Sequence, residues 1–527
     1  MIDGQQRMTT LQVALAAVRD LCVGPAEAYH ESWHRLTQNH VIFGGGGADE
    51  PFKVWPTMVD RDHFRHAMTA GSAAELTRLY ASPELLDHKD HLIPQAYLYF
   101  SEQAATWLGD LAGVELGDRM KALYTAVNND LHVVVIDLES DDDAQLIFQT
   151  LNALGAPLLP GDLVKNYLFH QAEAQGLNAE ELHADFWRPI DDEALFWREE
   201  VRQGRLTRPK IDLFFQHFLT LRTREDVGAT HLFPAFREFA EKRPDLSPKQ
   251  HLADIRTFSR IYKRFEEFPR TSPEGVFFYR LEQLDTTTVL PLLLEIFRRL
   301  DTVELRPQLL RVLADVESFL VRRSVCCLTT KAYNRIFLDI LQALDTEVSA
   351  TADSLRELLL RSDAPTNRWP DDGEFSSALL DAPLYTVLVR KRLRMLLEAL
   401  EMGIRTAKSE VVALPSDLTV EHLMPQSWKE HWPLPNVEPH DKEASSRERF
   451  VHTLGNLTLL TRKLNPSVSN AAWASKREAI FEHSGLMMNR QLYTFSEWHE
   501  GAILQRGIDL TKVALTLWPR PTVGVAT

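Results

Sequence analysis

The sequence predicts a mostly helical α+β protein that contains several domains. Its 527 residues exceed the size that one hydrophobic core usually supports, and 44% of them are apolar, enough for about two to four cores. Apolar residues recur at helical spacing along much of the chain, whereas runs of β-branched residues are few and short. We therefore expect helical domains with a small amount of β-structure.

The N-terminal residues predict a turn followed by a helix. Ile2 is typical of the end of a strand, and Asp3-Gly4 of a tight turn. Apolar residues recur at helical spacing from Thr9 to Leu21, so a helix is expected there. Amide groups at the start of such a helix, together with Arg7, would suit a phosphate group.

The next predicted elements are a strand and two helices. His132 to Leu138 contains a β-branched run typical of a strand. An acidic loop then leads into a helix over Ala144 to Leu154, which ends at a Gly-Ala-Pro break. After Pro160-Gly161, Asp162 is expected to cap the following helix.

Helical patterns dominate the middle of the chain, from about Leu195 to Leu400. Apolar stripes between Leu309 and Leu320 and between Lys331 and Leu344 predict the core faces of two helices. Leu384 to Leu400 predicts a further helix. The polar stretch from Ser362 to Gly373 is expected to be a loop.

The C-terminal part, which begins near Val411, predicts two strands followed by a helix. The expected strands are Leu418 to Glu421 and Leu457 to Leu460, and the polar loop Pro425 to Ser446 lies between them. Ala471 to Phe481 predicts the helix. This order is the ββα-metal arrangement of HNH nucleases.

A carboxylate beside a histidine, followed by two spaced asparagines, is the order of functional residues in an HNH nuclease. Here these residues are Glu421, His422, Asn456 and Asn465. Glu421 and Asn465 offer hard oxygen ligands for Mg²⁺ or Mn²⁺. His422 titrates near neutral pH and can remove a proton from water. The pattern therefore predicts hydrolysis of a phosphodiester, in which a cation neutralises the charge that repels the nucleophile.

Two further residues of this part are candidates with alternative roles. Asn456 is counted among the catalytic residues, although bracing the His422 loop through backbone hydrogen bonds is its preferred role. Lys476 could contact the scissile phosphate, and a solvated helix lysine is an equally good interpretation. His431, His440 and His452 lie in or beside the loop, and each is expected to be a surface group.

The charge distribution permits a nucleic-acid substrate despite a net charge of −16. From Arg405 onward, 14 basic residues slightly outnumber 13 acidic ones. Between Arg447 and Arg477 there are six basic residues and one acidic residue, and phosphate contacts need only such a local patch. Taken alone, a cluster of this size more often marks a solvated face.

Composition excludes several classes of protein. No apolar run is long enough to span a membrane, and the N-terminus lacks the pattern of a signal peptide. The three cysteines, Cys22, Cys326 and Cys327, form no Cys-x-x-Cys motif, so neither a zinc ribbon nor a disulfide framework is expected. A cytoplasmic protein without a membrane partner is the natural inference.

Four blocks of the sequence, in this order, resemble the GmrSD family of modification-dependent (type IV) restriction endonucleases. The last block contains the HNH residues, and the resemblance covers nearly the whole chain. The blocks are Asp3–Thr10, Phe148–Leu158 with Asp162–Asn166, Phe319–Cys326, and Glu421–Arg477.

The resemblance implies three domains. Residues 1–190 would form a ParB-like α/β domain that binds and hydrolyses a nucleoside triphosphate, residues 191–400 a helical domain, and residues 401–527 the HNH nuclease. The family carries further strands before the first block, so this N-terminal domain is expected to be truncated. No P-loop motif is present. The expected nucleotide-binding residues are Asp3, Gly4, Gln5, Gln6 and Arg7.

Two functions follow from these patterns. The first is a metal-dependent DNA endonuclease of phage defence that cuts modified foreign DNA and is linked to an NTP-dependent sensor domain. The second is a non-catalytic remnant of such a nuclease that binds nucleic acid or nucleotide. The complete set of HNH residues favours the first, and the missing start favours the second. A homo-oligomer is compatible with either function.

Overall fold

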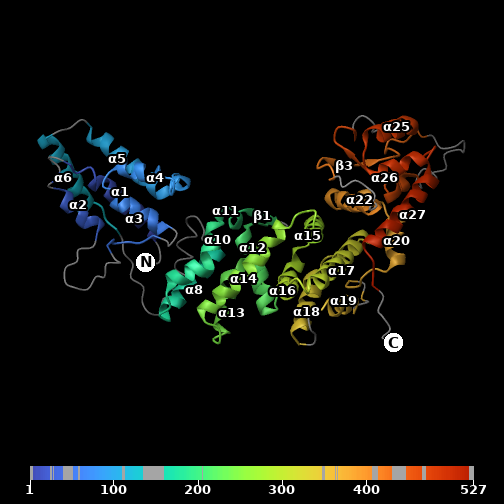
Figure 1. The fold of residues 1–527 in the computed structure, drawn as a ribbon, viewed down its shortest axis with the longest axis horizontal. Helices are drawn as coiled ribbons and strands as arrows, with labels where there is room; N and C mark the ends of the chain where they lie inside the picture. Colours follow the sequence, from blue (N-terminus) through green and yellow to red (C-terminus); the bar gives the residue numbers. More distant parts are fainter. Residues whose placement is uncertain are drawn as a thin grey trace. The chain divides into compact units, whose positions relative to one another are not determined.

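The computed structural model forms two compact units, Met1–Trp197 and Arg198–Thr527, and each is described by itself (Figure 1). The residues that the structure describes are 4–23, 27, 29–38, 51–56, 60–109, 113–133, 159–203, 206–346, 351–361, 364, 366–405, 413–429, 432, 447–465 and 470–521.

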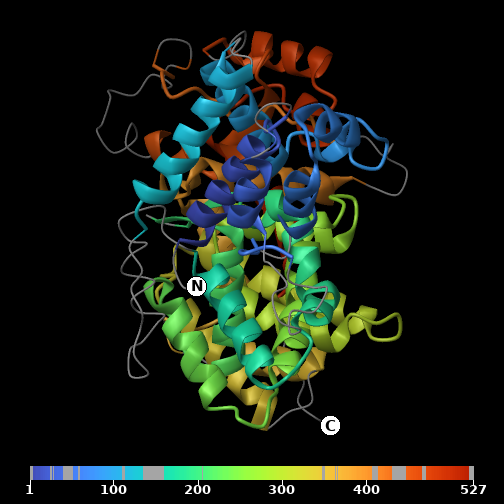
Figure 2. The ribbon, with the colours of Figure 1, turned by 90° about the vertical axis from the view of Figure 1, so that its left-hand side faces the viewer.

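In the first unit, α1 packs against α2, α3 and α5. Val13, Phe64 and Tyr97 are fully buried in this core. Its first helices, blue in Figure 2, are α1 (Gln5–Arg19), α2 (His30–Thr37), α3 (Arg61–Thr69), α4 (Ala73–Tyr80), α5 (Leu92–Leu108) and α6 (Gly113–Asn129). After a gap follow α8 (Pro160–Ala174), α9 (Ala179–Leu182), the π-helical turn η4 (His183–Trp187), α10 (Arg188–Asp192) and α11 (Ala194–Trp197).

Two details of the N-terminal predictions were wrong. Helix α1 begins at Gln5 and not at Thr9, because the backbone of Gly4, with φ of 87°, makes the turn directly before it. Asp162 does not cap α8 but lies in its first turn, since Pro160 already has the φ that a first helical residue needs.

The α/β character expected of the N-terminal domain stays a prediction. The described residues of the first unit contain helices and one isolated β-bridge, between Gln38 and Phe52. His132 and Val133, the start of the predicted strand, are not in a strand. The rest of that strand and the predicted helix 144–154 lie outside the described residues.

The second unit begins with a short hairpin and continues as packed helices. Strands β1 (Glu200–Gln203) and β2 (Leu206–Pro209) pair antiparallel. The helices are α12 (Lys210–Thr223), α13 (Leu232–Glu241), α14 (Pro248–Glu267), α15 (Pro273–Leu284), α16 (Leu290–Leu300), α17 (Arg306–Val325), α18 (Tyr333–Thr346), α19 (Ala352–Leu360), α20 (Asp372–Asp381), α21 (Leu384–Val387) and α22 (Arg390–Ile404).

The predicted apolar stripe of α17 is confirmed, because Leu309, Leu313, Val316 and Leu320 are all buried. The single helix predicted over residues 384–400 is instead two helices, α21 and α22. Val389 between them is extended, as is common for a β-branched residue. The break places α21 beside the C-terminal strands, where it contributes to the candidate site.

The C-terminal part has the predicted strand, strand and helix order. Strand β3 (Leu418–His422) pairs antiparallel with β4 (Leu457–Thr461), and His422 lies opposite Leu457. A 3₁₀ turn, η7 (Leu454–Asn456), precedes β4, and α25 (Trp473–His483), α26 (Met487–Arg490) and α27 (Glu500–Leu517) follow it. Both strands and α25 agree with the predictions to within two residues.

Helices that begin before residue 401 pack directly on this C-terminal part. Helix α22 packs against β3, β4, α26 and α27, and α20 packs against α27. These helices therefore pack against the C-terminal part within the second unit, which also has a core cluster of its own residues between Leu423 and Ile503. The expected division into domains at residues 190 and 400 stays a prediction.

A buried arginine of α17 holds two distant segments together. The guanidinium of Arg322, which is fully buried, donates hydrogen bonds to the carbonyls of Trp518 (2.7 Å) and Pro370 (3.1 Å) and to Asp372 (2.7 Å). The segment before α20 and the residue that follows α27 are therefore both fixed to α17. A buried guanidinium is favourable only while such acceptors are present.

We expect Arg322→Ala to lower the free energy of unfolding by about 3 kcal/mol, because it leaves buried carbonyls without a donor. Urea unfolding followed by tryptophan fluorescence measures this change. Arg335→Ala on α18 is the control, since that side chain is 84% exposed and its loss should change stability by less than about 0.5 kcal/mol. Equal midpoints for the two variants would contradict the bracing role of Arg322.

Candidate active site

The C-terminal strands and α25 bring Glu421, Asn465 and Lys476 together. Glu421 is the penultimate residue of β3, Asn465 follows β4, and Lys476 lies on α25. The ammonium of Lys476 donates to Glu421 Oε1 (2.8 Å) and to the carbonyl of His422 (2.5 Å). His422 follows Glu421 on the strand, so the two side chains leave β3 on opposite faces.

Glu421 and Lys476 form a buried ion pair. Burial raises the pKa of Glu421, against the opposing effect of Lys476 and of a hydrogen bond with Asn465. Burial likewise lowers the pKa of Lys476, although Glu421 opposes this shift. Lys476 is completely buried, so its position favours a positioning role over a direct contact with a phosphate.

His422 is held as a neutral imidazole. Burial, followed by the charges of His452, Lys476 and Arg390, lowers the pKa of His422 to about 3. Its Nε2 lies 3.2 Å from Nδ1 of His452, and its Nδ1 lies 3.5 Å from Nε2 of Gln426. A neutral ring keeps one nitrogen as a proton acceptor, as a general base requires, although the lowered pKa also makes that nitrogen a weaker base.

Asn456 joins the loop after β3 to the turn before β4. Its Oδ1 accepts hydrogen bonds from the amide of Met424 (2.8 Å) and from Nε1 of Trp498 (3.0 Å). Its Nδ2 donates to the carbonyls of Met424 (2.9 Å) and Val451 (2.8 Å). The amide is fully buried with two acceptor and two donor bonds, and this arrangement supports bracing over a direct part in the chemistry.

Helix α27 approaches the η7 turn so closely that only glycine fits there. A Cβ atom on Gly455 would lie 2.0 Å from the carbonyl oxygen of Ile503, and Gly507 faces Gly455 from the helix. Arg506, also on α27, donates to the carbonyls of Gly455 (2.7 Å) and Leu457 (2.8 Å). Burial lowers the pKa of Arg506 to about 9. These contacts fix the turn that carries Asn456.

Three residues near His422 were missed by the sequence analysis. The ring of Tyr385, on α21, lies 4.1 Å from that of His422, and Arg390 stacks on Tyr385 at 3.3 Å. His452, which was predicted to be a surface group, is half-buried, and its carbonyl accepts from the Tyr385 amide (3.2 Å). No local motif marks Tyr385 or Arg390, because tertiary packing alone brings them to the site.

The basic segment between Arg447 and Arg477 is less exposed than its composition suggests. Arg447 is buried, forms an ion pair with Glu500 and donates to the carbonyl of Trp432 (2.7 Å). Lys476 is buried beside Glu421. Arg449, Arg462 and Lys463 are exposed and remain candidates for contacts with a phosphate backbone.

The side-chain oxygens beside β3 are of the kind that divalent cations bind. Among the described residues, no three His, Cys, Asp or Glu side chains gather into a metal site. Glu421 and Asn465 nevertheless lie together and offer one carboxylate and one amide oxygen, and Mg²⁺ commonly takes one or two protein oxygens plus substrate phosphates and water. Because Lys476 already neutralises Glu421, the protein itself offers such a cation little net negative charge.

The proposed nucleotide-binding residues lie at the start of α1. Gly4 precedes the helix, Gln5 Nε2 donates to the carbonyl of Trp55 (3.0 Å), and Gln6 and Arg7 are exposed. Asp3 lies outside the described residues. The structure thus places three of these residues on the first turn of one helix.

We expect Asn456→Ala to lower the free energy of unfolding by about 3 kcal/mol or more, because it leaves two buried donors and two buried carbonyls without hydrogen-bond partners. Thermal and urea unfolding measure the loss. Asn470→Ala is the matched control, because exposed Asn470 accepts one hydrogen bond, from Ser427 (2.9 Å). If both variants unfold like the wild type, Asn456 does not brace the loop.

Comparisons with known proteins found two family models that match this chain. The family model described as GmrSD restriction endonucleases, C-terminal domain, matches residues 369–513. The model described as GmrSD restriction endonuclease, N-terminal domain, matches residues 1–169, and because this match starts at residue 1 it does not support the expected truncation. A comparison with curated proteins found no match.

The C-terminal match starts before α20 and therefore includes the helices that pack on β3 and β4. Within the described residues, no helix combines the length and hydrophobicity needed to cross a bilayer. The two matched ranges together cover more than half of the sequence, and the chain belongs to the GmrSD restriction endonuclease family.

Proposed function

We propose that this protein is a metal-dependent endonuclease of phage defence that hydrolyses phosphodiester bonds in modified foreign DNA. Membership of the restriction endonuclease family implies a DNA substrate. The observation that carries the proposal is the placement of Glu421, His422 and Asn465 around the paired strands β3 and β4.

In this proposal His422 accepts a proton from the attacking water. The side chain is only 5% exposed, and burial keeps the imidazole neutral at physiological pH. His452 lies within hydrogen-bonding distance of His422 and is half-buried, so it can pass the proton toward solvent. The ring of Tyr385 packs against both histidine rings, and Arg390 stacks on Tyr385.

Glu421 and Asn465 would hold a Mg²⁺ or Mn²⁺ ion. Such an ion neutralises charge on the phosphate and on the leaving oxygen. Lys476 positions the Glu421 carboxylate and the His422 carbonyl at once, which fixes the spacing between the metal ligand and the base. Asn456 fixes the loop that follows His422.

The N-terminal domain is proposed to be an NTP-linked sensor. Asp3, Gly4, Gln5, Gln6 and Arg7 would contact the phosphates, and the position of Gln5, Gln6 and Arg7 at the N-terminus of α1 supports this role. The match to the family's N-terminal domain model over residues 1–169 supports treating this part as the N-terminal domain of a GmrSD endonuclease. The domain division at residues 190 and 400 belongs to the same proposal.

A non-catalytic remnant that binds nucleic acid is the second candidate. The ion pair between Lys476 and Glu421 favours it, because a carboxylate already paired with an ammonium attracts a cation less strongly. The two candidates differ in one measurable respect, which is whether DNA is cut in the presence of a divalent cation.

We expect His422→Ala to reduce DNA cleavage by about a hundred- to ten-thousand-fold, the usual effect of losing a positioned base. Metal binding should survive, because Glu421 and Asn465 remain. The measurement is cleavage of plasmid and modified phage DNA across a Mg²⁺ and Mn²⁺ titration. His483→Ala on α25 is the control, since that side chain is 57% exposed. Cleavage by His422→Ala at the wild-type rate would remove His422 from the mechanism.

Asn465→Ala should weaken cation binding and leave the base intact. We expect its cleavage activity to recover in part at high Mn²⁺ or Mg²⁺, whereas His422→Ala should show no such recovery. Mn²⁺ binding followed by titration calorimetry gives a readout independent of cleavage. If wild-type protein neither cuts DNA nor binds the cation, the remnant is the better description.

A further inference from the structure

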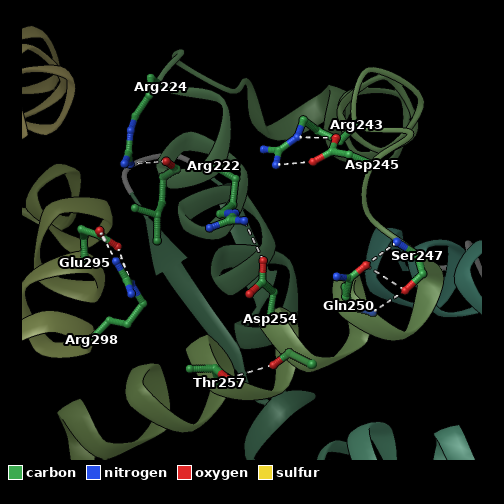
Figure 3. A network of polar contacts seen from close by, with 12 residues as sticks. Arg222, Arg224, Arg243, Asp245, Ser247, Gln250, Asp254, Thr257, Glu295 and Arg298 are labelled. Carbon is green, nitrogen blue, oxygen red and sulfur yellow. Dashed lines mark hydrogen bonds and ion pairs between the residues drawn. The ribbon is translucent and has the colours of Figure 1, made fainter. Parts of the chain in front are cut away.

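The helical part of the second unit contains a pocket lined mainly by arginines. Its volume is about 350 Å³, and a leucine, a glutamate and five arginines line it. The arginines come from three places in the chain: α12 and its C-terminal cap, the turn after α13, and α16. They are Arg222, Arg224, Arg243, Arg298 and Arg299. Figure 3 shows the first four around a shared space.

Carboxylates fix the direction of these guanidiniums. Arg222 pairs with Asp254 (2.7 Å), and Arg243 donates from Nε and Nη2 to Asp245 (3.0 Å each). Glu295, which is buried, accepts from Nε (2.9 Å) and Nη2 (2.7 Å) of Arg298. Arginines held in this way lose little side-chain entropy when a ligand binds.

Glu295 also holds the fifth arginine. Its Oε1 accepts from Nε of Arg299 (2.5 Å), so one carboxylate positions two neighbouring guanidiniums. Arg224 adopts a left-handed backbone conformation (φ 60°) at the end of α12 and donates to the carbonyl of Leu221. Its carbonyl in turn accepts from Gln342 (3.0 Å), which ties this cap to α18.

The lining of the pocket is rich in arginine although the whole chain is strongly acidic. Among the described residues, five arginines and one glutamate line it, and the carboxylates described above, Asp245, Asp254 and Glu295, pair with four of these arginines. The net charge of the chain is −16, so a cluster of five arginines is not expected from its composition. Planar guanidiniums match the oxygen geometry of a phosphate.

We propose that this pocket is a phosphate-binding site, separate from the candidate active site. Its size suits a small phosphoanion, since ligand pockets start at about 300 Å³. Of the described residues that line it, none is aromatic, so it offers no ring on which a base could stack. Recognition therefore rests on the phosphate, which either a free polyphosphate or a DNA backbone can supply.

A purely structural ion-pair network is the alternative. Arg222, Arg243 and Arg298 would then serve only to join α12, α13 and α16 to their neighbours. The exposure of the side chains argues against this role, because those of Arg243 and Arg298 are 42% exposed, whereas a packing contact would bury them. Exposed ion pairs add little to stability, and the pair of Arg243 with Asp245 is of this kind, whereas Arg298 also neutralises the buried Glu295.

The test measures binding in metal-free buffer with EDTA, where no metal-dependent cleavage takes place. Sodium tripolyphosphate is titrated calorimetrically into the full chain, and a labelled DNA duplex is followed by fluorescence anisotropy. The variants are Arg243→Gln and Arg298→Gln. Arg237→Gln is the matched control, because this arginine lies on α13, is also 42% exposed and does not line the pocket. Thermal unfolding checks that each variant folds.

We expect each pocket variant to weaken tripolyphosphate binding by about ten- to a hundredfold, the usual effect of losing a charge-assisted hydrogen bond, while Arg237→Gln binds like the wild type. A loss confined to the duplex, with a shallower salt dependence, would identify a DNA backbone as the source of the phosphate. If neither ligand distinguishes the pocket variants from Arg237→Gln, or if the wild type binds neither, the proposal is wrong. Because binding is measured without cleavage, its failure is distinct from that of the nuclease.

Discussion

The candidate active site depends on the buried side chain of Asn456. Two donors and two acceptors, from Met424, Val451 and Trp498, meet at this one amide. The loop after β3, the segment before η7 and the segment before α27 are thereby held together. Few side chains can replace it, since a carboxylate lacks the donors and an aliphatic group lacks both. Asn456 thereby fixes the loop that follows His422.

Local patterns were sufficient to predict β3, β4 and α25, whereas the hairpin β1–β2 was not predicted. The sequence also indicated the grouping of Glu421 with Asn465. Tyr385 and His452 could not be placed, since their contacts join segments separated by dozens of residues. The burial of Lys476 and Arg447 was equally hidden, because a basic residue and its acidic partner carry no sign in the sequence that they pair.

The same limit applies to helix boundaries. Leu384 to Leu400 has a continuous helical pattern, yet the helix is interrupted at Val389. Tyr385 of α21 then lies against the ring of His422. Tertiary contacts override a weak local preference at such a point. The arginine pocket is a further case: its residues are separated by up to about 80 positions, and only the packing of α12, α13 and α16 shows that they belong together.

The contact between Gly455 and α27 limits how the C-terminal part could be exchanged between proteins. Backbone meets backbone there without an intervening side chain, so the helix and the turn cannot shift past each other. Helix α27 is in turn packed on α20 and α22, which precede β3 in the chain. A gene fragment that encodes only the strands and α25 would leave these surfaces uncovered. Recombination that preserves this fold must therefore carry the preceding helices with it.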